Sequence, residues 1–271
     1  MSFFQAILLG LLQGLTEFLP VSSSGHLVLV PALLHWPEPG LAFTVAVHVG
    51  TLVAVLVYYR RDCAAILGRT LSWLLTRSAP IPDEARLLAM IIVGAIPAGI
   101  VGLTLESYVE RMFNSVALVG MALVGTAVVL LVAETFHRRS GREGVVSWFQ
   151  AILIGCAQAL AVIPGLSRSG MTIAAGLLCG LPRDWAARYA FLLSVPVILG
   201  AGLKETKELL AAHLPAHEWA LLGVGAAVSA ISGLAAIYVV VRAVHNRKLR
   251  WFAVYCLAAA AVAFIVTFAG H

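Results

Sequence analysis

The stretch FFQAILLGLLQGLTEFLPVSSSGH at residues 3–26 recurs without a gap as WFQAILIGCAQALAVIPGLSRSGM at residues 148–171. Eleven of the 24 aligned positions are identical, and the copies are offset by 145 residues. Both copies end in Ser-x-Ser-Gly, but their ionisable groups differ: Glu17, His26 and Arg168 stand opposite Val162, Met171 and Ser23. A duplicated scaffold with different charged groups in its copies predicts one composite site, in an architecture that recurs among membrane transport folds.

The composition is that of an integral membrane protein. Of the 271 residues, 61% are hydrophobic and 11% are charged, whereas a soluble domain carries about 25% charged residues. The mean hydropathy is +0.97. Six apolar stretches reach or approach the roughly 20 residues that cross a hydrocarbon core: 41–59, 87–105, 115–133, 186–203, 219–241 and 251–270. The N-terminal segment lacks the basic start of a signal peptide, so we expect it to be retained as structure.

Other common sites are not indicated by the sequence. The four cysteines are scattered and form no CxxC pattern, which argues against a cysteine metal site or a disulfide framework. No P-loop, GxGxxG or HExxH pattern is present. The net charge of +5 suits a membrane protein and identifies no nucleic-acid partner.

Each copy of the repeat is interrupted midway, by Pro20 in the first and by Pro164-Gly165 in the second. Proline ends a helix because it lacks an N–H and clashes with the preceding turn. The arms that follow, at 22–34 and 167–181, cover roughly 20 Å at about 1.5 Å per residue, which is too short to cross the membrane. We predict two re-entrant helical hairpins. The alternative is a single kinked spanning helix followed by a surface helix.

The loops between the expected spans differ in charge. Basic residues crowd the loops after the first, third and fifth spans: Arg60, Arg61, Arg69, Arg77 and Arg86; His137, Arg138, Arg139 and Arg142; Arg242, Arg247, Lys248 and Arg250. The loops after the second and fourth spans show no such excess: Glu106, Glu110 and Arg111; Lys204, Glu205, Lys207 and Glu208. The positive-inside rule therefore places the three basic loops in the cytoplasm.

This orientation predicts an inverted repeat. Each half would contain one hairpin and three transmembrane helices, and an odd number of spans inverts the second copy. The fold class we expect is an all-α integral membrane protein, with residues 1–271 forming one membrane domain. The first repeat would cover 1–140 and the second, inverted repeat 141–271, so that the hairpin tips meet near the midplane.

A serine-rich turn opens the second arm at each tip. Helix N-termini present unpaired N–H groups and about half a positive charge, which favour anions such as phosphate. Gly25 and Gly170 permit close backbone approach, and the guanidinium of Arg168 matches phosphate oxygens. Serine caps alone are ordinary helix starts, but two of them beside an intramembrane arginine favour an anion site. The hydroxyl donors would be Ser22, Ser23, Ser24, Ser167 and Ser169.

Ionisable groups lie beside the first tip. Glu17 follows Gln13 by one turn, so both project from one helical face. A carboxylate near a phosphate site is a metal ligand, a general base or a structural partner of Arg168. His26 can exchange a proton near neutral pH, and its place beside the serines distinguishes it from His48, which we interpret as a packing residue.

These residues resemble the bacterial undecaprenyl-diphosphatase family, also called the bacitracin-resistance family. Gln13-Gly-Leu-Thr-Glu17 fits its (E/Q)xxxE motif, and the segment from Phe18 to His26 fits its first loop. The segment from Pro164 to Thr172 fits its PGxSRSxxT motif throughout, and the resemblance extends over the whole chain. Many members have Glu where this chain has Gln13, so a second ionisable carboxylate is absent from this motif.

The resemblance implies a phosphoric anhydride hydrolase that converts undecaprenyl diphosphate to the monophosphate and phosphate. Such an enzyme recycles the lipid carrier of cell-wall precursors, with consequences for cell shape and bacitracin resistance. The resemblance further implies a divalent cation, Mg²⁺ or Ca²⁺, bound by Glu17. It implies a polyprenyl diphosphate lipid as substrate and a site facing the outer side of the bacterial inner membrane, and it leaves a homodimer open.

Site roles are carried over from the matching motifs. We expect Ser23 to attack phosphorus with His26 as its acid/base partner, because a serine hydroxyl needs an adjacent base. Glu17 would be the metal ligand or base, and Arg168 the clamp on the transferring phosphoryl group. The alternative is attack by metal-activated water. The expected phosphate-binding residues are Gln13, Ser22, Ser24, Gly25, Ser167, Ser169, Gly170 and Thr172.

Two other readings remain open. An inverted-repeat transporter or flippase of a phosphorylated lipid would share the architecture, and fold alone does not separate carrier from enzyme. The type-2 phosphatidic acid phosphatases have motifs that are partly echoed by Ser24-Gly25-His26 and Ser167-Arg168. No histidine follows Arg168 at their spacing, however, and their opening Lys/Arg motif is absent.

Overall fold

The computed structural model describes residues 1–37, 39–77, 79–105, 108, 111–112, 115–138, 145–211 and 215–269, with only the backbone for 204–211 and 269. Over these residues the chain is all-α. The helices of the first half are α1 (Phe3–Phe18), α2 (Ser23–Leu34), α3 (Leu41–Tyr58), α4 (Arg60–Thr76), α5 (Asp83–Thr104) and α7 (Val116–Phe136). Those of the second half are α8 (Trp148–Leu160), α9 (Arg168–Leu178), α10 (Arg183–Ala211), α11 (Ala216–His245) and α12 (Leu249–Ala269).

Six of these helices, α3, α5, α7, α10, α11 and α12, are long and apolar enough to cross a membrane. They coincide with the six predicted spans. Only 22% to 50% of each spanning window is buried inside the protein, and the outward faces carry large apolar side chains such as Ile92, Ile96 and Ile100 on α5. Continuous apolar surface of this extent belongs against lipid, so the protein is a multi-pass membrane protein.

Both copies of the repeat form two short helices joined by a turn. The hydroxyl oxygen of Ser22 caps α2 by accepting a hydrogen bond from the N–H of Gly25 at 3.2 Å. Ser167 caps α9 in the same way through the N–H of Gly170, at 3.1 Å. Serine is a favoured N-cap because its oxygen satisfies one of the unpaired amides of the first turn. Helices thus occupy the segments 22–34 and 167–181 where second arms were predicted, although α9 ends three residues earlier, at Leu178.

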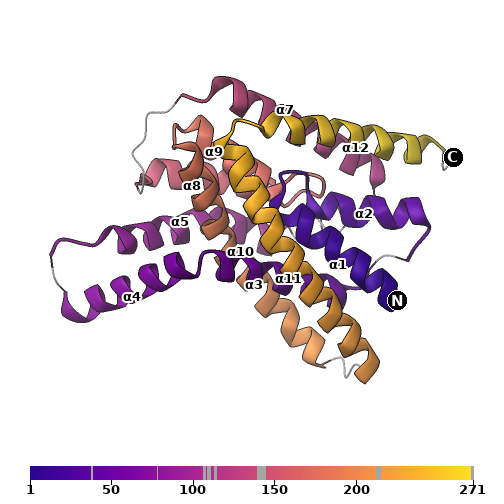
Figure 1. The fold of residues 1–271 in the computed structure, drawn as a ribbon, viewed down its shortest axis with the longest axis horizontal. Helices are drawn as coiled ribbons and strands as arrows, with labels where there is room; N and C mark the ends of the chain where they lie inside the picture. Colours follow the sequence, from indigo (N-terminus) through magenta and orange to yellow (C-terminus); the bar gives the residue numbers. More distant parts are fainter. Residues whose placement is uncertain are drawn as a thin grey trace.

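The turns of the two hairpins lie side by side near the centre of the molecule (Figure 1). A Cβ atom on Gly25 would lie 3.2 Å from Cα of Gly165, and a Cβ atom on Gly170 would lie 3.3 Å from Cβ of Pro20. Each residue of the first pair has its counterpart in the second pair, 145 positions away. The two tips therefore make the same contact in both directions.

The first arm of each hairpin packs on a spanning helix of the other half, α1 on α11 and α8 on α5. A Cβ atom on Gly10 would lie 2.6 Å from the carbonyl oxygen of Gly225. At Gly155, its counterpart in the second copy, the Cβ atom would lie 2.4 Å from the carbonyl oxygen of Gly94. Only glycine allows backbones to approach this closely, so the two halves interlock at matching positions.

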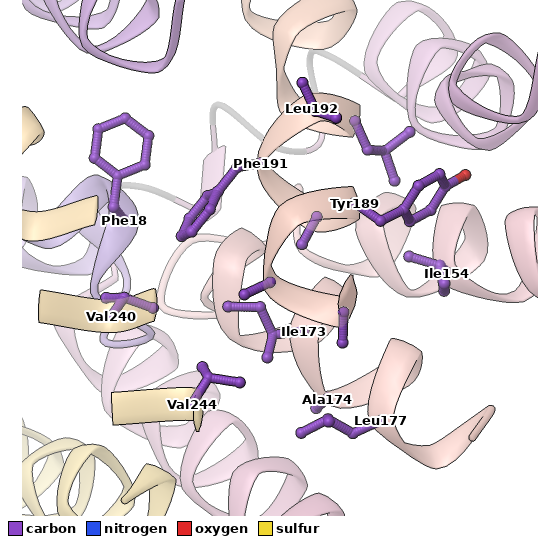
Figure 2. Close-up of a cluster of buried hydrophobic side chains, with 14 of the residues drawn as sticks. Phe18, Ile154, Ile173, Ala174, Leu177, Tyr189, Phe191, Leu192, Val240 and Val244 are labelled. Atoms are coloured by element: carbon purple, nitrogen blue, oxygen red, sulfur yellow. The ribbon is translucent and has the colours of Figure 1, made fainter. Parts of the chain in front are cut away.

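A buried apolar core surrounds α10 and reaches the first tip. Figure 2 shows Phe18, the last residue of α1, beside Phe191 of α10; their rings meet edge to face with centroids 5.7 Å apart. Tyr189 ties α10 to α5 by donating a hydrogen bond to the carbonyl oxygen of Met90 at 2.8 Å. Because Phe18 is fixed in this core, the neighbouring Glu17 is held at a defined position.

The basic segment after the first span is not the loop that we expected, because α4 occupies most of it. Its apolar side chains Leu67, Leu71 and Leu74 recur at helical spacing and are exposed, while Ile66 is the residue that it buries. Arg69 pairs with Glu84 of α5 at 3.3 Å. Helix α4 and the adjoining start of α5 extend away from the other helices (Figure 1), while the rest of α5 packs on α8 and α10.

Several loop charges used to orient the chain lie outside the described residues. These are Glu106, Glu110, Arg139 and Arg142, together with the side chains of Lys204, Glu205, Lys207 and Glu208. The expected boundary between the repeats, at 140–141, also lies outside the described residues.

Candidate functional site

A single buried carboxylate, that of Glu17, joins the two hairpins. Its Oε1 forms an ion pair with Nη2 of Arg168 from the second hairpin. Its Oε2 accepts hydrogen bonds from Oγ of Ser23 at 2.6 Å and from Nε2 of Gln13 at 2.8 Å. Nε2 of His48, on α3, lies 3.8 Å from the same oxygen. Four of the described side chains thus meet at one acid that is 6% exposed.

The first tip turns sharply enough to bring Ser23 back to Glu17. Ser22 has φ 69°, in the left-handed region that residues other than glycine seldom adopt, whereas its counterpart Ser167 has φ −77°. Such a conformation costs on the order of 1–3 kcal/mol and persists only where surrounding contacts enforce it. The strained turn is therefore particular to the copy that carries Glu17 and Ser23.

The second tip is held by Thr126 of α7. Its Oγ1 donates to the carbonyl oxygen of Gly165 at 3.1 Å and accepts from the N–H of Ser167 at 3.0 Å. Gly165 has φ +95°, and a Cβ atom there would lie 2.6 Å from the carbonyl oxygen of Val119. Glycine is required at this position. This clip fixes the start of α9, and with it the direction in which Arg168 leaves the helix.

The remaining predicted phosphate-binding residues lie around the two tips. Oγ of Ser22 is 3.2 Å from Oγ of Ser24, and the equivalent distance between Ser167 and Ser169 is 3.1 Å. Ser169 also donates to the carbonyl oxygen of Leu19 at 3.2 Å, which links the tips directly. These serine pairs are arranged alike in both copies.

The side chains of Thr172 and His26 have hydrogen-bond partners other than Glu17 and Ser23. The hydroxyl of Thr172 donates to the carbonyl oxygen of Arg168 at 2.8 Å, within α9. Nδ1 of His26 lies 2.8 Å from the carbonyl oxygen of Ser22, and its Nε2 lies 2.8 Å from the hydroxyl of Tyr255, with which it stacks. The group in contact with the hydroxyl of Ser23 is therefore the carboxylate of Glu17, and the role expected for His26 stays a prediction.

A cavity of about 300 Å³ lies against the two tips. Its polar wall contains Glu17, Ser22, Ser23, Ser24, His48, Gln158, Ser167 and Arg168. An apolar groove of about 390 Å³ between α5 and α10 shares four lining residues with the cavity: Ala98, Val162, Val197 and Ala201. Glycines at 99, 102 and 200 line the groove, and a Cβ atom at any of them would meet open space. The polar cavity and the apolar groove thus adjoin at these four shared residues.

The residues of the cavity would hold a divalent cation only together with oxygens of the substrate. The described residues contain no group of three or more His, Cys, Asp or Glu side chains suited to a metal ion. Glu17 is the one carboxylate among the described residues of the cavity wall. Because Mg²⁺ is commonly held by one or two carboxylates together with substrate phosphates and water, the site fits a cation that is bound partly by a diphosphate.

Four polar residues of the site and its surroundings were not predicted as functional residues: His48, Thr126, Gln158 and Tyr255. The interpretation of His48 as a packing residue is wrong, since it lines the cavity beside Glu17. Polar side chains within apolar spans are the signal that could have found the residues on α3, α7 and α12. For Gln158 the signal was its alignment with Gln13 in the repeat.

Comparison with known proteins agrees with this geometry. Residues 6–262 match the family model described as bacitracin resistance protein BacA. The undecaprenyl-diphosphatase of Geobacter sulfurreducens is 44% identical over 270 residues, which cover 99% of this chain and 100% of the relative. Undecaprenyl-diphosphatase 2 of Stutzerimonas stutzeri is 42% identical over 275 residues, or 100% of both chains. The undecaprenyl-diphosphatase of Chlorobaculum tepidum is 50% identical over 212 residues, or 76% and 75% of the two chains. The chain therefore belongs to the bacitracin resistance protein BacA family.

Proposed function

We propose that the protein is an undecaprenyl-diphosphate phosphatase, which hydrolyses the lipid-carrier diphosphate to the monophosphate and phosphate. The observation that carries this function is the Glu17–Arg168 pair between the hairpins, with the hydroxyl of Ser23 on the same carboxylate. A base, a nucleophile and an anion clamp are thereby assembled at the end of an apolar groove. The curated relatives at 42% to 50% identity carry the name of this activity.

The two adjoining cavities match the two parts of the substrate. The diphosphate, with its negative charge, enters the polar cavity beside Arg168 and the serine caps, where helix N-termini and hydroxyls supply donors. The prenyl chain lies in the groove between α5 and α10, whose glycines leave width for it. The groove and the cavity share Ala98, Val162, Val197 and Ala201, so the junction of tail and head group falls among these residues.

In the reaction that we infer, Oγ of Ser23 attacks the terminal phosphorus while Oε2 of Glu17 takes its proton. The new bond joins Oγ to phosphorus, and the bridging P–O bond breaks to release prenyl monophosphate. Arg168 leaves Glu17 to hold two oxygens of the transferring group, which a planar guanidinium does better than an ammonium. Glu17 passes the proton of Ser23 to the departing monophosphate and is a carboxylate again. It then takes a proton from the water that cleaves the phosphoserine to phosphate, and it returns that proton to Oγ of Ser23. Direct attack of water at phosphorus, with Glu17 as the base, is the alternative.

His26 acts in this proposal through the turn rather than through the hydroxyl of Ser23. Its contact with the carbonyl oxygen of Ser22 supports the strained residue that precedes the nucleophile. Tyr255 fixes the ring from α12. A divalent cation would be held by Glu17 together with the oxygens of the diphosphate, and when bound it neutralises charge on the phosphoryl groups.

We further infer that residues 1–140 and 141–271 are inverted repeats with re-entrant hairpins. The interlocked glycine contacts at matching positions of the two copies support this arrangement. The lengths of α1, α2, α8 and α9, between 11 and 16 residues, support arms that do not cross the membrane. The arginine-rich loops support opposite orientations of the two halves, and the family resemblance implies a site that faces the outer side of the bacterial inner membrane.

Phosphate release from undecaprenyl diphosphate by the purified protein tests the function. We expect release that stops with a chelator and resumes with added Mg²⁺ or Ca²⁺. A flippase of a phosphorylated lipid is the alternative that the interlocked repeats favour. To separate the two functions, lipid movement and phosphate release are both measured with the same protein in sealed vesicles. Lipid movement without phosphate release would contradict the proposed function.

A further inference from the structure

Gln158, near the end of α8, has a buried amide without a partner. The residue is 2% exposed, and neither Oε1 nor Nε2 has a hydrogen-bond partner among the described residues. Buried amides are nearly always paired, because leaving one unpaired forfeits its bonds to water. Gln158 lines the cavity that contains Glu17 and Arg168. Its free amide is therefore available to whatever occupies that cavity.

Comparison of the two copies of the repeat explains why the amide of Gln158 has no hydrogen-bond partner among the residues that the structure describes. Gln13, the counterpart of Gln158, donates its amide hydrogen to Glu17 four residues later. In the second copy Val162 stands where the first has Glu17. Gln158 keeps the amide but lacks the carboxylate that would pair with it. One glutamine is therefore bonded to Glu17, and the other lines the cavity with its amide unpaired in the described part of the chain.

The position of Gln158 indicates which part of the ligand it meets. Val162, four residues further on, lines both the polar cavity and the apolar groove. Gln158 lines the polar cavity but not the groove. The amide thus lies in the polar cavity close to the end of the groove, where a head group joins its tail. Glu17 and Arg168, but not Gln158, also line a small pocket against α10 that shares no residue with the groove. In the proposed function they hold the other end of the head group, where the terminal phosphoryl group reacts.

We propose that Gln158 binds the phosphate next to the prenyl chain, which is the leaving group of the reaction. Nε2–H donates to a non-bridging oxygen of that phosphate, and Oε1 accepts from a water molecule or from a protonated phosphate oxygen. Gln158 is then a substrate-binding residue that recognises the inner phosphate, the group that prenyl monophosphate keeps after the reaction. This inference rests on the proposed function, because it assigns the other phosphate to Arg168.

The test replaces Gln158 by leucine, which has similar volume and no polar atoms. We expect Gln158→Leu to raise KM for undecaprenyl diphosphate about tenfold, the effect of one lost charge-assisted hydrogen bond, with a smaller change in kcat. Inhibition by the product, prenyl monophosphate, weakens by a similar factor because the product keeps the inner phosphate. Inhibition by inorganic phosphate, which has only the terminal group, is unchanged.

Stability measurements separate binding from a structural role. Gln158→Leu removes an unpaired buried amide, so its thermal midpoint in detergent should stay level or rise. The matched control is Gln150→Leu on the same helix. Gln150 forms a capping box with Ser147 and donates to the carbonyl oxygen of Cys179 at 3.0 Å. This control should lower the midpoint and leave KM and product inhibition unchanged.

An unchanged KM and unchanged product inhibition in Gln158→Leu would overturn the inference. So would an equal loss of inhibition by inorganic phosphate, which would assign Gln158 to the terminal phosphoryl group. Gln158→Met, with an unbranched side chain, repeats the test if the leucine variant fails to insert. Failure of the proposed function is seen separately, as absence of phosphate release by the wild type.

Discussion

At the scale of single residues, the site depends on Glu17, because its carboxylate contacts side chains from both hairpins. A charge at membrane depth costs about 2.5–3.5 kcal/mol on insertion scales, so it is retained where it has partners and a use. Here the partners are Arg168 from the second hairpin and Ser23 and Gln13 from the first. Because the ion pair joins the two copies of the repeat, neither copy contains a complete site.

Ser23 is the residue whose role can be tested most sharply. If it is the nucleophile, Ser23→Ala should lower phosphate release by about 10³-fold or more, since the covalent route is lost. Acid quenching of the wild type with a terminally labelled diphosphate should trap labelled phosphoserine. The matched control is Ser24→Ala, which should reduce turnover far less. Substantial turnover by Ser23→Ala would assign the attack to water.

Gln13 should act only through its hydrogen bond to Glu17. Gln13→Glu keeps a possible donor, because the new carboxyl group can donate to Glu17 when it is protonated, and we expect activity within a few-fold of wild type. Gln13→Leu removes the donor and should lower kcat about tenfold, the effect of one hydrogen bond to a charged group. Equal activity of Gln13→Leu and wild type, measured as phosphate release, would show that this hydrogen bond has no function.

The sequence predicted most of these residues, because the repeat marks positions where the copies differ. It did not predict the contact of Ser23 with Glu17 rather than with His26, because that contact depends on the left-handed turn at Ser22. His48 was misjudged because periodicity alone does not show which face of α3 meets α1. Tyr255 lies 229 positions from His26, and local patterns carry no information about such a pairing.

At the scale of elements, α5 and α10 form an apolar groove beside the polar cavity, which is the arrangement that a phosphatase acting on a lipid needs. Its walls are small residues on two different helices, and one end opens into the polar cavity. Small residues within spans are also common at packed helix interfaces. The sequence therefore did not reveal the groove, which exists because α5 and α10 leave their glycines unopposed along this stretch.

Filling the groove tests whether it holds the prenyl chain. A Cβ atom at Gly99 would meet no protein atom within 4 Å, so we expect Gly99→Leu to fold normally. We expect KM for undecaprenyl diphosphate to rise about tenfold or more, as lost methylene contacts would require. Inhibition by inorganic phosphate should not change. Gly223→Leu on α11 is the control, because its Cβ atom also meets open space, away from the groove. Equal KM values in the two variants would place the tail elsewhere.

Helix boundaries were predicted where the sequence contains strong local signals. The starts of α2 and α9 follow serine caps, and the spans follow long apolar runs. Helix α4 was missed because its arginines suggested a solvated loop. Its leucines recur at a helical period, which was the signal to use.

The whole molecule is organised by the exchange of first arms between halves, α1 on α11 and α8 on α5. An inverted repeat requires the α4 segment and the segment between α5 and α7 to lie on opposite sides of the membrane. In a chain whose native cysteines are replaced, Ser72→Cys should label only from the cytoplasm and Tyr108→Cys only from outside. Asn246→Cys provides a second cytoplasmic position. Labelling of positions 72 and 108 from the same side would contradict the inverted topology.

The central claim is that the two hairpin tips form one phosphatase site. It is tested most directly by phosphate release from undecaprenyl diphosphate by the wild type, Glu17→Gln, Arg168→Lys and the double variant. Residues that act as a unit show losses that do not multiply. We predict a loss of about 10²-fold or more in each single variant, and no further loss in the double variant, while all four proteins insert and purify alike. Near-normal release by either single variant, or losses that multiply in the double variant, would contradict a site shared between the tips.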